Sequence, residues 1–182
     1  MPLWPLALNF SWEIINSVLG YKYSGLGAQV VINIVWAIFD AFIVITYFRF
    51  GYRHAPKRVP RPVFLCWSVV VFAAAAIVEY AFVAEFGLAA GRAYAAFLRN
   101  LLMSVLFIAM LVDRNSSDGQ SQTIAVCKGL GTLCPTLLFG LIGGGGLDAD
   151  RFLLTLGLQC FIFDTVYVFL LARMQRSGAL FG

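Results

Sequence analysis

Six long apolar segments, separated by short polar breaks, constrain the fold of this chain more than any other feature. Each is close to the ~20 residues that an α-helix needs to cross the hydrocarbon core of a bilayer. Only 12% of the residues are charged, against about 25% in an average soluble domain. The sequence therefore predicts an all-α, polytopic transmembrane bundle of about six spans, forming a single domain over residues 1–182. The predicted spans are roughly 3–20, 28–50, 62–86, 89–112, 122–142 and 152–172.

The lysine and arginine residues indicate an orientation for this bundle. Most of them fall on the side that includes loop 51–61, and basic loops stay in the cytoplasm. We therefore expect an integral membrane protein, in the plasma membrane of a bacterium or the endoplasmic reticulum of a fungus, with loop 51–61 cytoplasmic. Because this topology signal accounts for the net charge of +4, a nucleic-acid partner is not expected.

Three carboxyl groups lie in the middle of predicted spans, at Glu13, Asp40 and Asp164. A charged group at the centre of a membrane helix costs about 2.5–3.5 kcal/mol on insertion scales, so a chain tolerates one that is neutralised, paired or used. Desolvation favours the neutral acid, which is the form that proton-initiated chemistry needs. Glu79 lies nearer the end of its span, where an ion pair with Arg99 would be structural.

Polar residues recur at helical spacing, so they share faces that should point into the bundle. These polar faces would enclose a central cavity. They comprise Asn9, Glu13 and Asn16; Gln29, Asn33, Trp36 and Asp40; Lys128, Thr132 and Pro135; and Cys160, Asp164 and Tyr167. Aromatic residues flank the carboxyls. Each of them alone suits packing or a lipid-facing surface, whereas together they suit a wall of π-faces that stabilises a cation.

Motifs for other chemistries are absent from the sequence. It has no HExxH zinc motif, no Walker loop and no serine-nucleophile elbow, and its single histidine, His54, falls in loop 51–61. The four cysteines form no CxxC pair, which suits packing residues rather than a disulfide framework. We expect no metal and no cofactor.

Five short motifs, in order along almost the whole chain, resemble a known family. The chain resembles the small integral-membrane terpene cyclases of fungal meroterpenoid and indole-diterpene pathways, which have bacterial relatives acting on prenylated indoles. The motifs are Asn9-Phe10-Ser11-Trp12-Glu13, Trp36-Ala37-Ile38-Phe39-Asp40, Asn100-Leu101-Leu102-Met103-Ser104, Lys128-Gly129-Leu130-Gly131-Thr132 and Phe163-Asp164-Thr165-Val166-Tyr167. The resemblance implies that Glu13 and Asp164 are essential, and that a polyprenyl chain is cyclised by protonation of an alkene or epoxide without a metal. It also implies seven spans, one more at the N-terminus than the six counted here.

The leading hypothesis is a membrane-embedded terpene cyclase acting on a prenylated aromatic or indole-type substrate. Glu13 or Asp164 would donate the proton, the other would tune it or accept the final proton, and Asp40 would orient or relay. The expected substrate-binding residues are Asn9, Trp12, Asn33, Trp36, Phe39, Asn100, Ser104, Lys128, Phe163 and Tyr167. The expected partners are a prenylated small molecule and membrane lipid, with no obligate protein partner.

Two other classes of function fit parts of the pattern. A small proton-coupled transporter or carrier would also carry acids and a lysine inside the membrane, although no internal repeat is visible. A non-catalytic membrane scaffold is the third possibility, and the aligned polar faces argue against it.

Overall fold

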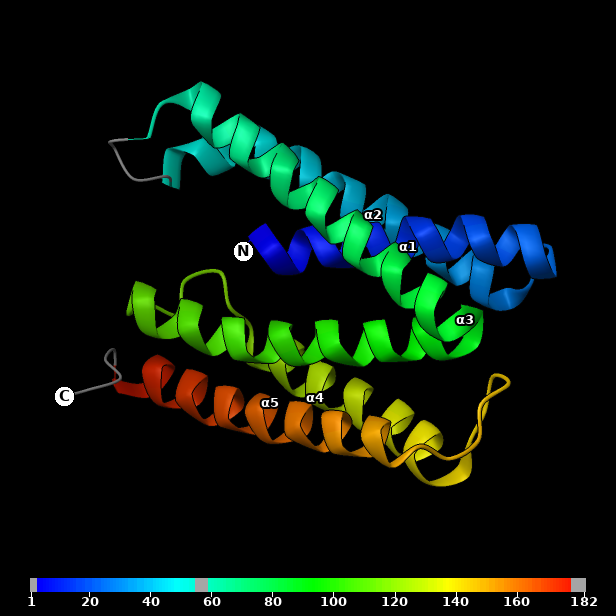
Figure 1. Cartoon of the computed structure of the whole chain (residues 1–182). Coiled ribbons are helices and arrows are strands. Elements are labelled where there is room, and N and C mark those ends of the chain that lie inside the picture. Colours follow the sequence, from blue (N-terminus) through cyan, green and yellow to red (C-terminus); the bar gives the residue numbers. More distant parts are fainter. Residues whose placement is uncertain (1–2, 55–58, 178–182) are drawn as a thin grey trace. The chain divides into compact units, whose positions relative to one another are not determined.

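The structure is a computed structural model that describes residues 3–54 and 59–177. Within these residues the regular secondary structure is entirely helical (Figure 1), which confirms the prediction of an all-α chain. The elements are α1 (Leu3–Ser24), α2 (Ala28–Phe50), the short 3₁₀ helix η1 (Gly51–His54), α3 (Arg61–Arg114), α4 (Gln122–Leu137), the π-helical turn η2 (Leu138–Ile142) and α5 (Arg151–Ser177).

Four helical stretches of the described residues are long and apolar enough to cross a membrane. They are Ala28–Arg53, Arg61–Arg114, Gln122–Ile142 and Arg151–Ser177. Helix α1 is not among them, and the two predicted spans on either side of residue 87 both fall within α3, which joins two helices across a kink. The expected count of about six spans is therefore not confirmed.

Gly87 interrupts α3 between the predicted spans 62–86 and 89–112. Its backbone has φ 78° and ψ 174°, a conformation that glycine adopts readily because it has no Cβ. The residues on either side remain helical. Gly87 is thus a kink at which two helices, both included in α3, meet.

The chain divides into two compact units, an N-terminal unit over Leu3–Arg92 and a C-terminal unit over Ala93–Gly182. In the N-terminal unit, α1 and α2 lie side by side. The first part of α3 packs on both of them. Ala7 and Leu8 of α1 bury against Val71 and Ala75 of α3, and α2 meets α3 through aromatic pairs such as Phe48–Phe72, whose ring centroids are 5.9 Å apart.

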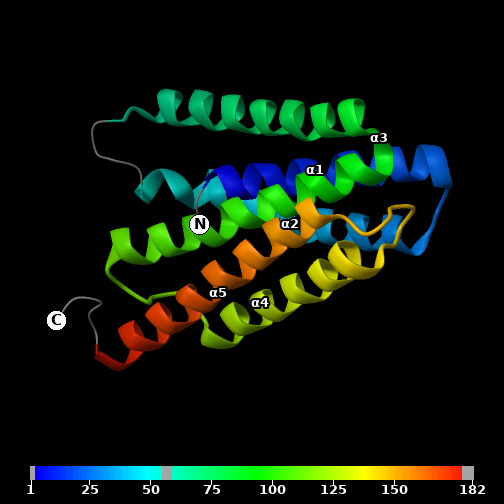
Figure 2. The same ribbon diagram turned by 60° about the horizontal axis from the view of Figure 1, so that its bottom comes forward.

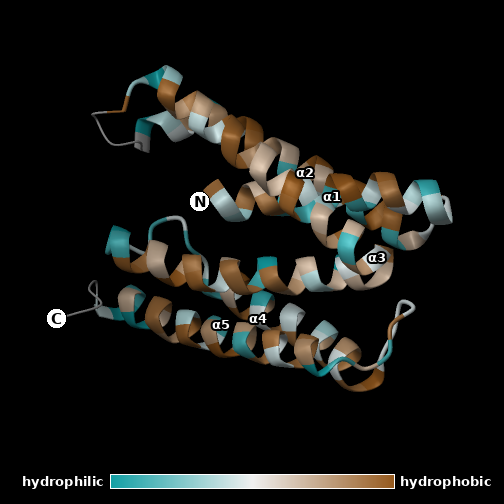
Figure 3. Ribbon diagram, in the orientation of Figure 1, coloured by the Kyte–Doolittle hydropathy of each residue, from teal (hydrophilic) through white to brown (hydrophobic). Residues whose placement is uncertain are grey.

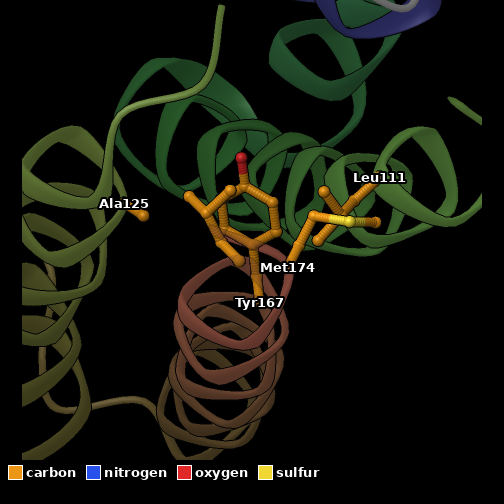
Figure 4. Close-up of a cluster of buried hydrophobic side chains, with 5 residues drawn as sticks. Leu111, Ala125, Tyr167 and Met174 are labelled. Atoms are coloured by element: carbon orange, nitrogen blue, oxygen red, sulfur yellow. The ribbon is translucent and has the colours of Figure 1, made fainter. Parts of the chain in front are cut away.

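In the C-terminal unit, α4 and α5 lie side by side (Figure 2) and the last part of α3 packs against them. One core cluster joins these three helices, through Leu111 of α3, Ala125 of α4, and Tyr167, Leu171 and Met174 of α5 (Figure 4). The prediction that residues 1–182 form a single domain stays a prediction.

Small residues let α4 and α5 approach closely, as is common where membrane helices pack. A Cβ atom added at Gly157 of α5 would lie 2.1 Å from the hydroxyl oxygen of Thr136 on α4, far inside van der Waals contact. This contact fixes how far one helix can slide along the other. It therefore sets which polar residues of α4 stand opposite α5.

Helix α2 buries Asn33 and Asp40 and exposes much of its apolar surface. Its buried residues are Val30, Asn33 and Asp40, whereas bulky side chains such as Ile38 and Phe42 are exposed. Coloured by hydropathy, α2 is mostly brown, the apolar end of the scale (Figure 3). This arrangement suits a helix whose outer surface contacts lipid and whose costly polar groups are kept away from it.

Candidate active site

The C-terminal unit gathers polar side chains from three helices around Asp164. The Lys128 ammonium lies 2.5 Å from Asp164 Oδ1 and donates a second hydrogen bond, 2.7 Å long, to the Ser104 hydroxyl. Asp164 is 2% exposed and Ser104 is fully buried. Each group is the other's partner inside an apolar bundle, where either one alone would be left unpaired.

Two further side chains complete a ring of hydrogen bonds around this ion pair. The Asn100 amide donates to the Thr132 hydroxyl at 2.8 Å, and the Thr132 oxygen lies 3.5 Å from Asp164 Oδ2. Ser104 closes the ring by donating to the main-chain carbonyl of Asn100 at 3.0 Å. We call Asn100, Ser104, Lys128, Thr132 and Asp164 the lysine network.

Helical spacing explains how the lysine network forms. Asn100 and Ser104 are one turn apart on α3, as Lys128 and Thr132 are on α4, so each helix presents two polar groups on one face. Asp164 of α5 contacts the polar pair of α4, which in turn contacts the pair of α3. The contact between Thr136 and Gly157 keeps α4 at the height where its pair faces Asp164.

The N-terminal unit has a second polar cluster, built around Asp40. The side-chain amide of Asn9 on α1 donates a hydrogen bond to Asp40 Oδ2 on α2. Glu13 lies one turn after Asn9 on α1, and both Glu13 and Asp40 are 6% exposed. Asn33, two turns before Asp40, is buried and its side-chain oxygen accepts from Gln29 at 2.8 Å. The burial of Glu13, Asn33 and Asp40 agrees with the inward polar faces predicted for these helices, whereas Gln29 and Trp36, predicted to share the inward face of α2, are exposed.

Arg92 joins α1 to the part of α3 that follows Gly87. Its Nε donates to the Asn16 side-chain oxygen at 2.7 Å and its Nη2 donates to the Asn16 carbonyl at 3.3 Å. In return, the Trp12 indole donates to the Arg92 carbonyl at 3.2 Å. Trp12, expected to bind substrate, thus has its ring nitrogen engaged by the backbone of the same unit. We call Asn9, Glu13, Asn16, Asp40 and Arg92 the amide cluster.

The other aromatic residues expected to line a cavity differ in their surroundings. Trp36 and Phe39 of α2 are 56% and 57% exposed and meet edge to face, with centroids 6.2 Å apart. Phe163 of α5 is half-buried. Tyr167 is buried, stacks on Phe107 and donates its hydroxyl to Gln120 at 2.6 Å, which are contacts of a core residue. A role toward substrate stays a prediction for all four residues.

Outside the predicted spans, Asp150 caps the N-terminus of α5. Its carboxylate accepts the Tyr94 hydroxyl at 2.6 Å and the main-chain N–H of Phe152 at 2.7 Å. These hydrogen bonds, that of Tyr94 above all, lower the pKa of Asp150 below its ordinary value of 3.8. Asp150 therefore stays ionised and ties α5, which carries Asp164, to α3.

Sequence reasoning missed three members of these clusters as site residues: Asn16, Arg92 and Thr132. Asn16 shares a face with Asn9 and Glu13 in the sequence but was not singled out as a site residue. Thr132 shares a face with Lys128 in the sequence, and that spacing was the available signal for it. Arg92 is placed by its sequence among the loop cations, because nothing in the sequence shows that its guanidinium turns back to Asn16. Within the described residues no group of three or more His, Cys, Asp or Glu side chains could hold a metal ion.

The fold and these clusters define a helical membrane protein with buried acids tied to amide, hydroxyl and ammonium groups. The model of one family, the Pyr4-like transmembrane terpene cyclases, matches residues 1–144. The chain belongs to this family, as the resemblance of its motifs implies. The match includes Glu13, Asp40, Asn100 and Lys128 and ends before Asp164.

Three curated relatives support the same family. The chain is 28% identical to terpene cyclase pyr4 of Aspergillus fumigatus, over 97% of this chain and 75% of that protein. It is 30% identical to the Pyr4-family terpene cyclase mfmH of Annulohypoxylon moriforme, over 76% of this chain and 57% of that protein. It is 28% identical to terpene cyclase cdmG of Talaromyces verruculosus, over 72% and 55%. The matches to the last two thus span little more than half of each relative, and no solved structure matches the chain.

Proposed function

We propose that this chain is a membrane-embedded terpene cyclase that protonates an alkene or epoxide of a prenyl chain and guides the resulting carbocation through ring closure. Its family membership and the names of its relatives support the reaction class. The observation that carries the proposal is the Lys128–Asp164 pair, an acid–base group buried among apolar helices. The substrate is a prenylated aromatic or indole-type molecule whose tail enters from the lipid.

The proposed reaction balances without any further reagent. The π electrons of the alkene, or a lone pair of the epoxide oxygen, form a bond to a proton delivered by a carboxylic acid. Ring closure then moves the positive charge along the chain. Loss of a proton from carbon to a base ends the reaction, so that substrate and product are isomers.

We assign the two ends of this reaction to different acids. Because Asp164 is paired with Lys128, we give it the role of the base that accepts the final proton. We assign the donor role to Glu13, the other acid that the family resemblance implies to be essential. Asp40 orients the donor through the amide cluster, and aromatic faces hold the cation.

The setting of this reaction is the bilayer. The chain is proposed to span it with loop 51–61 in the cytoplasm, because most basic residues fall on that side. Substrate and lipid are its partners, and neither a nucleic acid nor an obligate protein partner is part of the proposal.

The test is product analysis of membranes containing the wild-type chain or Glu13→Gln, incubated with farnesylated and geranylgeranylated aromatics with and without a terminal epoxide. We expect a cyclised isomer from the wild type and a loss of at least ~100-fold in Glu13→Gln, the lower end of what general acid catalysis contributes. Glu79→Gln, which also removes a buried carboxyl from the N-terminal unit, is the matched control and should keep most of the activity.

Two results would overturn the proposal. An equally abundant Glu13→Gln with wild-type activity would exclude this acid as the donor. A wild-type chain that cyclises no member of the panel, yet moves protons with a solute across vesicles in a Glu13-dependent way, would establish the carrier instead.

A further inference from the structure

Thr132 occupies a central position in the lysine network. Its hydroxyl oxygen lies 2.8 Å from the Asn100 amide that donates to it, 3.0 Å from the main-chain carbonyl of Lys128 and 3.5 Å from Asp164 Oδ2. The residue is 4% exposed. A buried hydroxyl between an amide donor and two acceptors can direct its single proton to only one of those acceptors at a time.

The two oxygens of Asp164 are not equivalent in this arrangement. Oδ1 accepts from Lys128, and an ammonium carries only donors, so it cannot accept a hydrogen bond from a protonated oxygen. A proton added to Asp164 while Lys128 still donates to Oδ1 must therefore reside on Oδ2. The side chain that lies beside Oδ2 is Thr132.

The Thr132 hydroxyl can match both protonation states of Asp164 without moving its oxygen. When Asp164 is a carboxylate, the hydroxyl proton points to Oδ2. When Oδ2 is protonated, it donates to the second lone pair of the Thr132 oxygen, and the hydroxyl proton turns to the Lys128 carbonyl. The first lone pair stays with the Asn100 amide throughout, because a hydroxyl has one donor and two acceptor positions.

We propose that Thr132 is a positioning residue that makes Oδ2 of Asp164 the atom that accepts the final proton. This inference rests on the proposed function, in which Asp164 is the base. It adds to that function the atom that receives the proton, the side chain that stabilises the protonated state, and a role for Asn100 in holding that side chain. No bond other than the O–H bond of Oδ2 forms or breaks on the protein in this step.

The charged and titratable groups that face Asp164 bear on its protonation. Lys128 reaches it from α4, and Cys160, one turn earlier on α5, interacts electrostatically with both partners of the ion pair. From α3 it is faced by the neutral side chain of Ser104, through Lys128, and by Asn100, through Thr132. Arg99, the neighbour of Asn100, is the charged residue nearest to them in the sequence of α3.

The kinetic test removes only the hydroxyl group. Thr132→Val keeps the shape of the side chain, and we expect kcat to fall roughly 10- to 100-fold, as when one hydrogen bond to a charged group is lost, with KM unchanged. Thr132→Ser keeps the hydroxyl and should restore kcat. The matched control is Thr155→Val, since the Thr155 hydroxyl on α5 makes the same kind of bond to a carbonyl one turn back, at 2.8 Å, without a hydrogen bond to Asp164.

A second measurement decides the inference without any catalysis. Infrared spectra of the purified chain in nanodiscs, recorded during acidification, should reveal the C=O stretch of protonated Asp164 as the band absent from Asp164→Asn. In Thr132→Val this band should move to higher wavenumber, because the acid has lost its hydrogen-bond acceptor. It should stay in place in Thr132→Ser and Thr155→Val.

The outcomes separate this inference from the proposed function. An unmoved band in Thr132→Val, or no Asp164 band down to the lowest pH at which the chain stays folded, overturns the role of Thr132 even if the wild type is an active cyclase. A moved band supports it even if no substrate of the panel is cyclised, a result that would count against the proposed function alone.

Discussion

The lysine network and the amide cluster use their cations in different ways. In the C-terminal unit Lys128 lies against a carboxylate and a serine hydroxyl. In the N-terminal unit the hydrogen bonds of Arg92 go to the two neutral oxygens of Asn16, and Asp40 accepts from the neutral amide of Asn9. Both arrangements tie polar side chains of neighbouring helices together, and the first is built on the ion pair between Lys128 and Asp164.

This difference assigns a different physical task to each cluster. An ion pair in a low-dielectric setting depends on both partners, because either charge alone is left uncompensated. An amide–carboxyl bond is weaker, and it can persist when the carboxyl is neutral, because an amide both donates and accepts. The lysine network therefore suits a group that rests as a base, and the amide cluster suits a carboxyl that carries a proton for part of the cycle.

The largest expected effect is the loss of one side of the ion pair. We expect Lys128→Met to lower the free energy of unfolding by about 3–5 kcal/mol, because Asp164 would remain buried without its cation. Adding Asp164→Asn to the same chain should recover most of that loss, since no charge then remains in the network. Denaturation in mixed micelles at increasing SDS concentration measures the free energy of unfolding of the single and the double variant.

Lys22→Met is the matched control for this prediction. Lys22 lies at the exposed end of α1 with its ammonium over the Tyr23 ring, so its loss should change stability by less than about 0.5 kcal/mol, as surface substitutions usually do. If Lys128→Met proved as stable as Lys22→Met, the pair would not be the buried, interdependent group described here.

The helices themselves could largely be predicted from the sequence. The predicted segment 28–50 coincides with α2, because Gly27 and Gly51 punctuate a continuous apolar run. The form of the break near residue 87 was harder to predict. Hydropathy marks where an apolar run is interrupted, but it does not reveal that the backbone leaves the helical conformation at one glycine and then resumes it.

The candidate site could be predicted from the sequence only in part. Spacing placed Lys128 and Thr132 on one face, but which face meets Asp164 depends on the register of α4 and α5. That register is set by the contact between Thr136 and Gly157, which no charge or motif in the sequence indicates. The bond between Asn9 and Asp40 likewise joins helices whose relative rotation no single-helix pattern determines.

A smaller effect is expected in the amide cluster. Asn9→Leu keeps the size of the side chain but removes a donor to Asp40, and we expect a loss of about 1–3 kcal/mol, the usual cost of withdrawing one hydrogen bond from a buried polar group. Ser17→Ala, which removes a hydroxyl that donates to the main-chain carbonyl of Glu13 at 2.6 Å, is the control on the same helix and should cost less. A loss in Asn9→Leu equal to that in Lys128→Met would erase the distinction between the two clusters.

The smallest effect concerns Asp150, a carboxylate that is outside the predicted spans and therefore screened by water. Its pKa lies below the ordinary value of 3.8 because Tyr94 and the N-terminus of α5 donate to it. A lowered pKa in the folded chain contributes stability that is present above pH ~4 and lost as the pH falls through the folded value. Tyr94→Phe should therefore cost less than about 1 kcal/mol at pH 7, with the gap to wild type narrowing below pH ~4.

Unfolding midpoints of the wild type and Tyr94→Phe between pH 3 and pH 8 measure this difference in stability. The matched control is Tyr80→Phe, at an exposed tyrosine of α3, which should show no pH-dependent difference from the wild type. A gap that stayed constant to pH 3 would mean that Tyr94 stabilises the chain by packing on Phe152, whose ring lies 5.7 Å away, and not through the Asp150 carboxylate. A narrowing gap would show that the same type of side chain, an aspartate bound by a neighbouring hydroxyl, contributes little where water screens it. The large effect expected at Asp164 would then follow from its burial and its lysine partner rather than from its hydrogen bonds alone.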